Sequence, residues 1–176
     1  NDTQSLQSII KLTNNRFVVS WSSYRQDGSQ NGTYGQLYDS QLNQIGTEFQ
    51  INTTTAGQQV ADCAASFDNG FVIIWYGPDS DSNGVIGQFF DNDANKVGGE
   101  IIINTHQDKN QYLSSVVKHN NELIVTWGSY EQDGDGNGIF AQKLDFSGNK
   151  IGDEFQVNVD SSGNQIRPAI ASNGSN

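Results

Sequence analysis

The sequence predicts an all-β protein built from repeated four-stranded antiparallel units. Its three tryptophans, Trp21, Trp75 and Trp127, follow one another at spacings of 54 and 52 residues. The text around them recurs as FVVSW, FVIIW and LIVTW. A fixed period of this length is typical of arrays in which each repeat buries its apolar face on its neighbour. No segment shows a sustained helical period, so no helix is expected.

The period divides the chain into three complete units and the start of a fourth. Residues after about 159 begin the lead-in of the next unit again, and the chain contains no methionine. We therefore expect a segment of a longer array. The predicted units are 1–58, 59–110, 111–164 and, as the start of a fourth, 165–176.

The middle unit shows why four strands are expected in each repeat. The run FVIIWY is apolar, β-branched and aromatic, which is typical of a strand covered on both faces. Asp68-Asn69-Gly70 before it is a turn signal. The connections have hairpin length, so neighbouring strands should be antiparallel. The predicted strands are 59–66, 71–76, 85–91 and 100–105, with loops at 77–84 and 92–99.

Four-stranded antiparallel units of about this length are typical of β-propeller blades, in which both faces of the central strands are buried. A β-trefoil and another stacked-sheet array are the alternatives. Three blades do not close a ring, because rings use about 4–8 blades.

Composition limits the classes of partner. The net charge is −11 with only nine Lys and Arg, which disfavours nucleic acid and anionic membrane surfaces. No apolar run approaches the ~18 residues of a membrane span. The single cysteine, Cys63, lies in an apolar stretch and is predicted to be a small buried hydrophobe.

The loop between the second and third predicted strands is the candidate metal site. Two copies read D-x-D-x-N-G, and alternate oxygen ligands in a tight loop suit Ca²⁺. The alternative is ordinary turn chemistry, since Asp, Asn and Gly also form hairpin turns without a metal. The first copy, from Asp27 to Gly32, lacks the central Asp and is the weaker candidate. The candidate calcium ligands are Asp79, Asp81, Asn83, Asp133, Asp135 and Asn137.

Two further repeated features are expected to be structural. Loops after the third predicted strand run from Asp39 to Asn43, from Asp91 to Asn95 and from Asp145 to Asn149, and we interpret them as hairpin turns. The recurring glutamines are predicted to bond through their side-chain amides to neighbouring backbone. They are Gln36, Gln88 and Gln142.

Other residues are candidates for ligand contact or modification. The tryptophans are expected to pack between repeats, whereas Tyr24, Tyr76 and Tyr130 at the loop edge are candidate ligand contacts. Asn31 begins an Asn-x-Thr sequon and is a candidate glycosylation site in a secreted protein. No catalytic motif is present, and no catalytic residue or organic cofactor is expected.

The motif W-x-S-x-x-Q-D-G-x-x-x-G-x-x-x-Q-x-x-D followed by E-F-Q-V-N gives the chain a family resemblance. It resembles the tandem ~50-residue propeller-type repeats of very large secreted or surface proteins of bacteria and some ciliates. The D-x-D-x-N-G loops resemble the calcium hairpins of integrin α-subunit propellers. The best matches are 21–39 and 127–145, and the middle copy departs at WYGPDSDSNG. The resemblance implies an extracellular, repetitive scaffold and supplies no catalytic residue.

The functional expectation is a non-enzymatic scaffold outside the cell or at its surface. Its role would be adhesion, surface-layer or filament assembly, with calcium ordering the loops and further copies or neighbouring repeats as partners. The alternative is a multivalent carbohydrate-binding module, and a glycan-cleaving enzyme is the third hypothesis. For an enzyme, a carboxylate that breaks the repeat is expected, yet Glu48, Glu100 and Glu154 share one repeat position.

Overall fold

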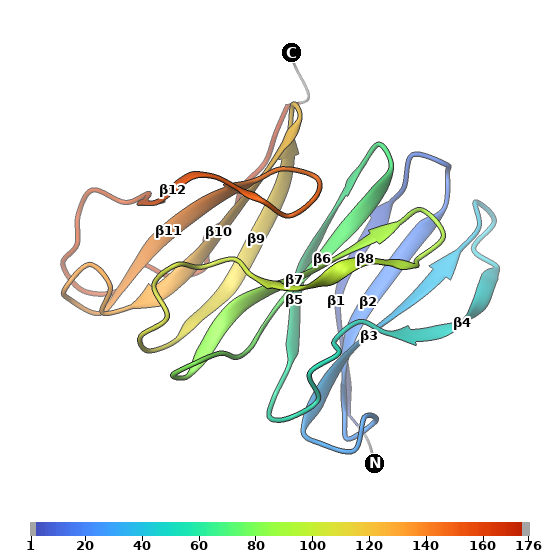
Figure 1. Cartoon of the computed structure of the whole chain (residues 1–176), viewed down its shortest axis with the longest axis horizontal. Helices are drawn as coiled ribbons and strands as arrows, with labels where there is room; N and C mark the ends of the chain where they lie inside the picture. Colours follow the sequence, from blue (N-terminus) through green and yellow to red (C-terminus); the bar gives the residue numbers. More distant parts are fainter. Residues whose placement is uncertain (1–2, 174–176) are drawn as a thin grey trace.

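The computed structural model describes residues 3–173 and contains strands and no helix in that range. Twelve strands form three separate four-stranded antiparallel sheets (Figure 1). The first sheet contains β1 (Gln4–Lys11), β2 (Phe17–Tyr24), β3 (Asn31–Tyr38) and β4 (Gln44–Gln50). The second contains β5 (Val60–Phe67), β6 (Gly70–Pro78), β7 (Asn83–Asp91) and β8 (Lys96–Ile102). The third contains β9 (Gln111–His119), β10 (Glu122–Tyr130), β11 (Asn137–Leu144) and β12 (Lys150–Gln156).

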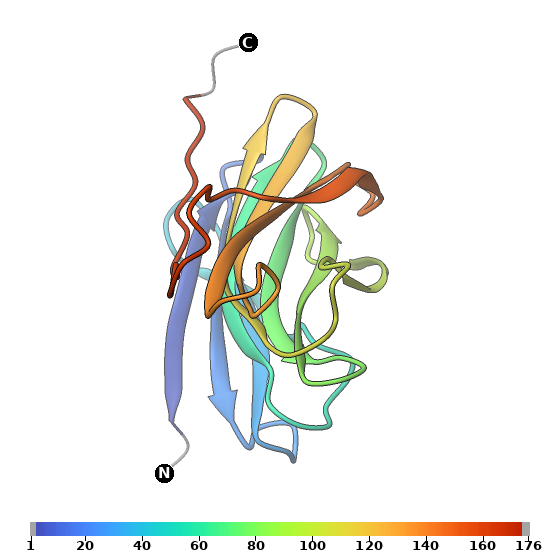
Figure 2. The ribbon, with the colours of Figure 1, turned by 90° about the vertical axis from the view of Figure 1, so that its left-hand side faces the viewer.

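The sheets stack in chain order, with the second sheet between the other two (Figures 1 and 2). The first strands make most of the contacts between sheets: β1 packs on β5, and β5 packs on β9. Within residues 3–173 the sheets close neither a barrel nor a ring. The predicted repeated four-stranded units are therefore confirmed as a stack of separate sheets.

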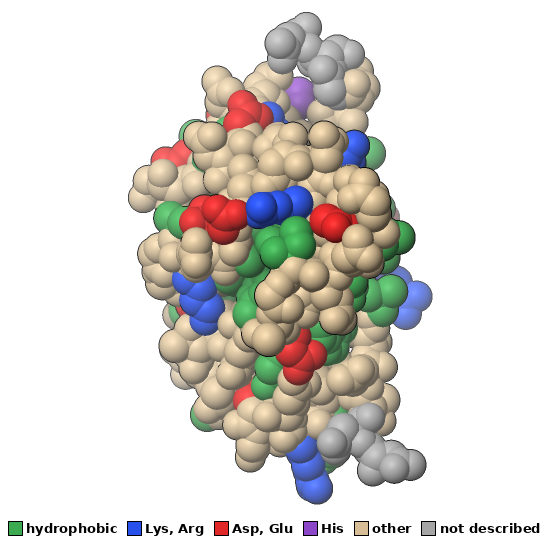
Figure 3. All heavy atoms as spheres, turned by 90° about the vertical axis from the view of Figure 1, so that its right-hand side faces the viewer, with side chains coloured by type: hydrophobic (Ala, Val, Ile, Leu, Met, Phe, Trp, Pro, Cys, Tyr) green, Lys and Arg blue, Asp and Glu red, His purple; other side chains and the backbone are tan. Residues whose placement is uncertain are grey.

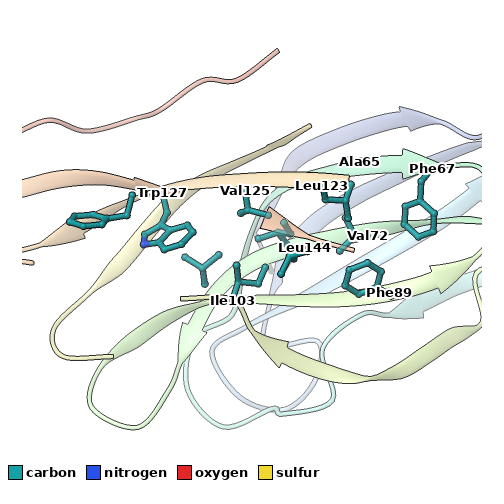
Figure 4. Close-up of a cluster of buried hydrophobic side chains, with 12 residues drawn as sticks. Ala65, Phe67, Val72, Phe89, Ile103, Leu123, Val125, Trp127 and Leu144 are labelled. Atoms are coloured by element: carbon teal, nitrogen blue, oxygen red, sulfur yellow. The ribbon is translucent and has the colours of Figure 1, made fainter. Parts of the chain in front are cut away.

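The central strand of the second sheet explains the continuous apolar run in the sequence. Phe71, Ile73 and Trp75 face the first sheet, whereas Val72 and Ile74 face the third. All five side chains are fully buried because the strand is covered on both sides. Figure 4 shows the second interface, where side chains of β6 and β10 point toward one another.

The tryptophans occupy equivalent places in the three sheets. Trp75 packs against the first sheet and Trp127 against the second, and both are 0% exposed. Trp21 holds the same position in the first sheet and is only partly buried, because no described sheet covers that face. The prediction that these residues pack between repeats is confirmed at both interfaces.

The recurring glutamines stabilise a β-bulge in each unit. The register of β7 and β8 shifts between Gly87 and Phe89, and Gln88 sits at the shift. Gln88 Nε2 donates to the carbonyl oxygens of Phe89 at 3.0 Å and Gly98 at 3.3 Å. Gln142 makes the corresponding bonds at the same shift in its sheet, and Gln36 donates to the carbonyl oxygens of Leu37 and Ile45. The predicted bonding of these amides to backbone is confirmed.

The fourth strand of the middle unit begins earlier in the sequence than predicted. The prediction is 100–105 after a loop at 92–99, whereas β8 begins at Lys96 and ends at Ile102. The reason is a tighter turn, in which Asp91 Oδ1 accepts the backbone N–H groups of Asp93 and Asn95, both at 2.9 Å. Asp39 and Asp145 make the same turn, so the interpretation of these loops as hairpin turns is confirmed.

Candidate functional site

The three D-x-D-x-N-G-type loops connect the second and third strands of each sheet. They join β2 to β3, β6 to β7 and β10 to β11 (Figure 1). Each loop closes a hairpin between paired strands, so its position in the unit is the same three times. The candidate calcium ligands therefore lie at equivalent points of successive sheets.

The first Asp of each loop caps the turn. Asp79 Oδ1 accepts the backbone N–H of Asp81 at 3.1 Å and that of Ser82 at 2.9 Å. Asp27 Oδ1 accepts the N–H of Ser29 at 3.0 Å. In the third loop Asp133 Oδ1 lies 3.5 Å from the corresponding nitrogen. These are the Asx-turn bonds that the turn interpretation predicts.

The glycine that ends each loop is required for space rather than for a left-handed backbone. None of Gly32, Gly84 and Gly138 has a positive φ. A Cβ on Gly84 would lie 2.7 Å from Asp79 Oδ2, and one on Gly32 would lie 2.6 Å from Asp27 Oδ2. The glycine therefore leaves room for the capping carboxylate.

The second Asp joins its loop to the connection that leads into the next sheet. Asp81 Oδ2 accepts the backbone N–H of Lys109 at 3.0 Å, and Asp135 Oδ2 accepts that of Gly163 at 3.0 Å. In the first unit Ser29 takes this place, and its Oγ donates to the carbonyl of Gly57 at 3.3 Å. The missing Asp of the first loop is therefore replaced by another hydrogen-bonding group.

The loop asparagines extend the same junction. Asn83 Nδ2 donates to Asn110 Oδ1 at 2.9 Å, and Asn137 Nδ2 donates to Asn164 Oδ1 at 2.6 Å. Asn83 and Asn137 also form isolated parallel bridges with these same residues. The loops consequently hold successive units together.

The oxygen atoms of the loops differ in what they bind. Asp79 Oδ2 is buried and has no hydrogen-bond partner, whereas Asp79 Oδ1 and Asp81 Oδ2 both accept amide protons. No three His, Cys, Asp or Glu side chains gather as a metal-binding group in the part of the chain that the structure describes. The arrangement offers one unsatisfied carboxylate oxygen and a set of side-chain oxygens already engaged by protein.

The candidate ligand tyrosines do not form one repeated set. Tyr24 pairs with Asn31 and Tyr130 with Asn137, so these two tyrosines are equivalent. Tyr76 instead pairs with Val85, and the residue of its strand that pairs with the loop asparagine Asn83 is Pro78. Tyr130 is 39% exposed. Tyr76 lies between two hollows at successive sheet junctions, of about 460 and 260 Å³. Tyr24 lines the larger one and Tyr112 the smaller.

The repeated glutamates join one sheet to the backbone that follows the previous sheet. Glu100 on β8 accepts the backbone N–H groups of Thr53 and Thr54 and the hydroxyl of Thr54. Glu154 on β12 accepts the N–H of Thr105 at 2.5 Å. Lysines four residues earlier donate to the same threonines, through Lys96 and Lys150. This polar clamp was not predicted, although its repeat position was visible.

A hollow of about 590 Å³ opens beside the second clamp. It is lined by Gln132, Gln142, Lys150 and Glu154, among others. Burial lowers the pKa of Lys150, and the nearby Glu154 carboxylate opposes this effect. Gln132 Nε2 donates to Glu154 Oε1 at 2.6 Å, so the glutamate is held from both sides.

Asp62 is a half-buried carboxyl group that sequence reasoning missed. It lies on β5 at a bulge, and burial raises its pKa to about 6 despite hydrogen bonds from Ser114. The neighbouring Cys63, predicted to be a small buried hydrophobe, is only partly buried and packs against the core, and desolvation raises the pKa of its thiol. An acidic residue inside the strand VADCAAS was the signal that could have revealed the site.

Asn31, the candidate glycosylation site, is the first residue of β3 and is half-buried. Its carbonyl oxygen accepts the backbone N–H of Gln59 at 2.8 Å, which places the residue at the junction of the first two sheets.

No protein-family model and no curated protein sequence matches the chain. The described residues contain no helix with the length and hydrophobicity to cross a membrane.

Proposed function

We propose that the chain is part of a non-enzymatic extracellular repeat scaffold that acts in adhesion, surface-layer or filament assembly. The observation that supports it is the pattern of burial at one repeat position. Trp75 and Trp127 are completely buried only because a preceding sheet covers them, while Trp21 at the end of the stack is partly exposed. Each unit therefore depends on a neighbour for its core, as in other repeat arrays.

The proposal includes β-propeller-type stacking of the units. In support, the sheets are antiparallel and four-stranded, they stack face to face, and their first strands lie next to one another. Glu100 accepts the N–H of Thr53 and Glu154 that of Thr105, which is the same contact in two successive junctions. A repeated structural task for these glutamates favours a scaffold over an enzyme, whose catalytic acid would differ between repeats.

The scaffold proposal is tested by lengthening the array. A second copy of residues 59–110 is inserted after Asn110, and unfolding in urea is followed by circular dichroism. Because stability in an array grows with each interface, we expect a higher free energy of unfolding and a larger m-value than for the unmodified chain. A control insert of equal length carries Ile73→Glu and Trp75→Glu. If the inserted copy without substitutions lowers stability as much as the control insert does, the proposal is overturned.

We also propose that Ca²⁺ binds the loops at 79–84 and 133–138. Support comes from the buried, unpartnered Asp79 Oδ2 and from the net charge of −11. A cation there would offset the charge of the loop carboxylates and stabilise the folded state by linkage. The test compares the Tm in 5 mM CaCl₂, MgCl₂ and EDTA, concentrations chosen on the order of weak extracellular sites.

The matched variants distinguish specific binding from general screening. Asp81→Asn combined with Asp135→Asn keeps an acceptor for the backbone N–H but removes both charges, and should abolish the calcium-dependent rise in Tm. The control Asp153→Asn removes an exposed carboxylate outside the loops and should leave the rise intact. An equal Tm in calcium and EDTA for the unmodified chain would remove the metal from the proposal and leave the scaffold untouched.

A multivalent carbohydrate-binding module is the second candidate, favoured by the two hollows that adjoin Tyr76. Aromatic rings beside amide groups suit the apolar faces and hydroxyl groups of sugars. A glycan array followed by titration of the best ligand tests it. We expect Tyr76→Ala to lose binding and Tyr38→Ala, outside the hollows, to keep it. An array without any ligand rejects this candidate.

A further inference from the structure

Both ends of the stack expose an apolar sheet face. The outer face of the first sheet, here called the head face, consists of Leu6, Ile9, Phe17, Val19 and Trp21. Leu6 and Ile9 are 61% and 60% exposed. Figure 3 shows hydrophobic side chains gathered in the middle of this end of the molecule. The outer face of the third sheet, here called the tail face, consists of Val117, Ile124, Ile139, Phe155 and Val157.

The two faces correspond to the two sides of the interfaces inside the chain. The head-face residues Phe17, Val19 and Trp21 are the repeat equivalents of Leu123, Val125 and Trp127, which are buried against the second sheet. The tail-face residues Ile124, Ile139 and Val157 are the equivalents of Val72, Val85 and Ile103. In the second sheet, those three residues belong to the same core cluster as Leu123, Val125 and Trp127. The molecule thus carries one half of its own internal interface at each end.

We infer that the head face of one copy of this chain docks on the tail face of a second copy. The inference rests on the proposed scaffold function and specifies its partner. The occupant is a second copy because the interface continues one that the chain already makes twice. Such a contact is head-to-tail, so both partners keep one free face and can add further copies.

The polar clamp is incomplete at this pairing, which sets how docking should depend on salt. Glu48 is the equivalent of Glu100 and Glu154, and within residues 3–173 its carboxylate accepts a hydrogen bond from Gln26 Nε2 at 2.5 Å. The backbone N–H that its equivalents bind belongs, at the other end, to Val159, whose side chain is 100% exposed. The position of Thr54 is held there by Asp160, so Glu48 would approach a second carboxylate. With a net charge of −11 on each copy, association should strengthen as salt screens this repulsion.

The segment 165–173 occupies the place where the first strand of the docked copy would lie. Gln165 N–H donates to the carbonyl of Asn137 at 2.7 Å, as Gln59 N–H does to Asn31 before β5 begins. The segment belongs to no sheet (Figure 2). The side chain of Ile166 is 49% exposed. It must move aside for docking, so removing it should strengthen association.

The test uses two variants that each lose one face. Leu6→Glu with Ile9→Glu disables the head face, and Phe155→Glu with Val157→Glu disables the tail face. All four residues are already exposed, so the fold should persist, as circular dichroism and Tm will verify. Leu42→Glu, at a site 68% exposed and outside both faces, is the matched control. Each protein is studied by sedimentation velocity in 50 and 500 mM NaCl over a concentration series.

The expected pattern is specific to head-to-tail docking. The unmodified chain and the Leu42→Glu control associate, more strongly at 500 mM NaCl, and a chain ending at residue 164 associates at least tenfold more tightly. Each double variant alone stays monomeric. Their equimolar mixture gives a dimer and nothing larger, because one intact head meets one intact tail.

Three outcomes would overturn the inference. They are a monomeric chain under all these conditions with or without 165–176, self-association of either double variant, and a mixture that does not dimerise. If the lengthened array is more stable, none of these outcomes contradicts the scaffold proposal. Stacking would then occur only between units of one chain. Failure of the lengthened array together with dimerisation of the mixture would instead leave a docking surface without a repeat scaffold.

Discussion

Asp62 on β5 accepts two hydrogen bonds from Ser114 on β9, from the backbone N–H at 3.0 Å and from Oγ at 2.8 Å. The pair joins the second and third sheets at their first strands. Burial nevertheless raises the pKa of Asp62 to about 6, because loss of water disfavours the charge more than the two bonds stabilise it.

The raised pKa predicts a stability that falls as pH rises. The unfolded chain has an ordinary Asp pKa near ~3.9, so the folded state binds the proton more tightly. The stabilising effect of this proton is complete below about pH 4 and is lost as pH rises through about 6, with an upper bound of roughly 3 kcal/mol. Asp62→Asn should flatten the Tm profile between pH 4.5 and 7.

The comparison at pH 4.5–7 needs a matched exposed acid. Asp153→Asn serves this purpose and should leave the slope of the Tm profile unchanged. Below this range the profile should turn over, because hydrogen bonds from Asn43 and Asn149 lower the pKa of Asp39 and Asp145. An Asp62→Asn profile as steep as that of the unmodified chain would show that the group does not control stability.

Asn104 should be sensitive to the loss of either half of its amide. Its Oδ1 accepts the N–H of Val85 at 2.8 Å, and its Nδ2 donates to the carbonyl of His106 and to Gln111 Oε1. Asn104→Ala leaves these buried groups unpaired and should cost about 1–3 kcal/mol. Asn104→Asp keeps the acceptor but places a charge against two acceptors, so it should cost at least as much at pH 7. Urea unfolding measures both, with the exposed Asn69→Ala as control.

Equivalent tryptophans should differ in their contribution to stability. Trp75→Ala creates a cavity between two sheets and should lower the free energy of unfolding by about 3–5 kcal/mol. Trp21→Ala should cost clearly less, since that face is uncovered. If Trp75→Ala does not fold, Trp75→Phe and Trp21→Phe keep the comparison. Equal losses at the two sites would contradict the stacked arrangement.

Leu42 offers a stabilising substitution. Its φ is +63° and its side chain is 68% exposed, while Gly148 holds the same place in the third unit with φ +86°. A left-handed backbone costs a non-glycine residue roughly 1–2 kcal/mol, partly offset by the flexibility of unfolded glycine. Leu42→Gly should therefore raise stability by about 0.5–1 kcal/mol in urea unfolding. Ser40→Gly, in the same turn without a positive φ, should lower it slightly.

Much of the fold could be predicted because the three repeats can be aligned with one another within the one sequence. A residue that returns in three units at one position has the same local task, as Gln88 at its bulge and Asp91 in its turn show. Such tasks are local, involving backbone within about ten residues. The start of β8 was misplaced because the tightness of the Asp91 turn depends on bonds that spacing does not reveal.

The candidate site was less accessible from sequence. The pattern of the loops located Asp79 and Asp81, but their separate partners depend on how the next unit approaches, since Lys109 is 28 residues away from Asp81. The clamp by Glu100 likewise acts on residues 46 and 47 positions earlier. Asp62 carries no repeat signature at all, and its environment arises only where two sheets meet.

By itself the sequence determined that the chain is all-β, that it repeats, and which side chains hold each unit together, because these properties follow from period, turn chemistry and local backbone bonds. Only the tertiary structure decided which face of each strand is covered, which carboxylates are buried or engaged, and that both ends carry open apolar faces. Those features depend on the packing of whole sheets, and a strand with the same sequence pattern is buried or exposed according to whether another sheet lies on it.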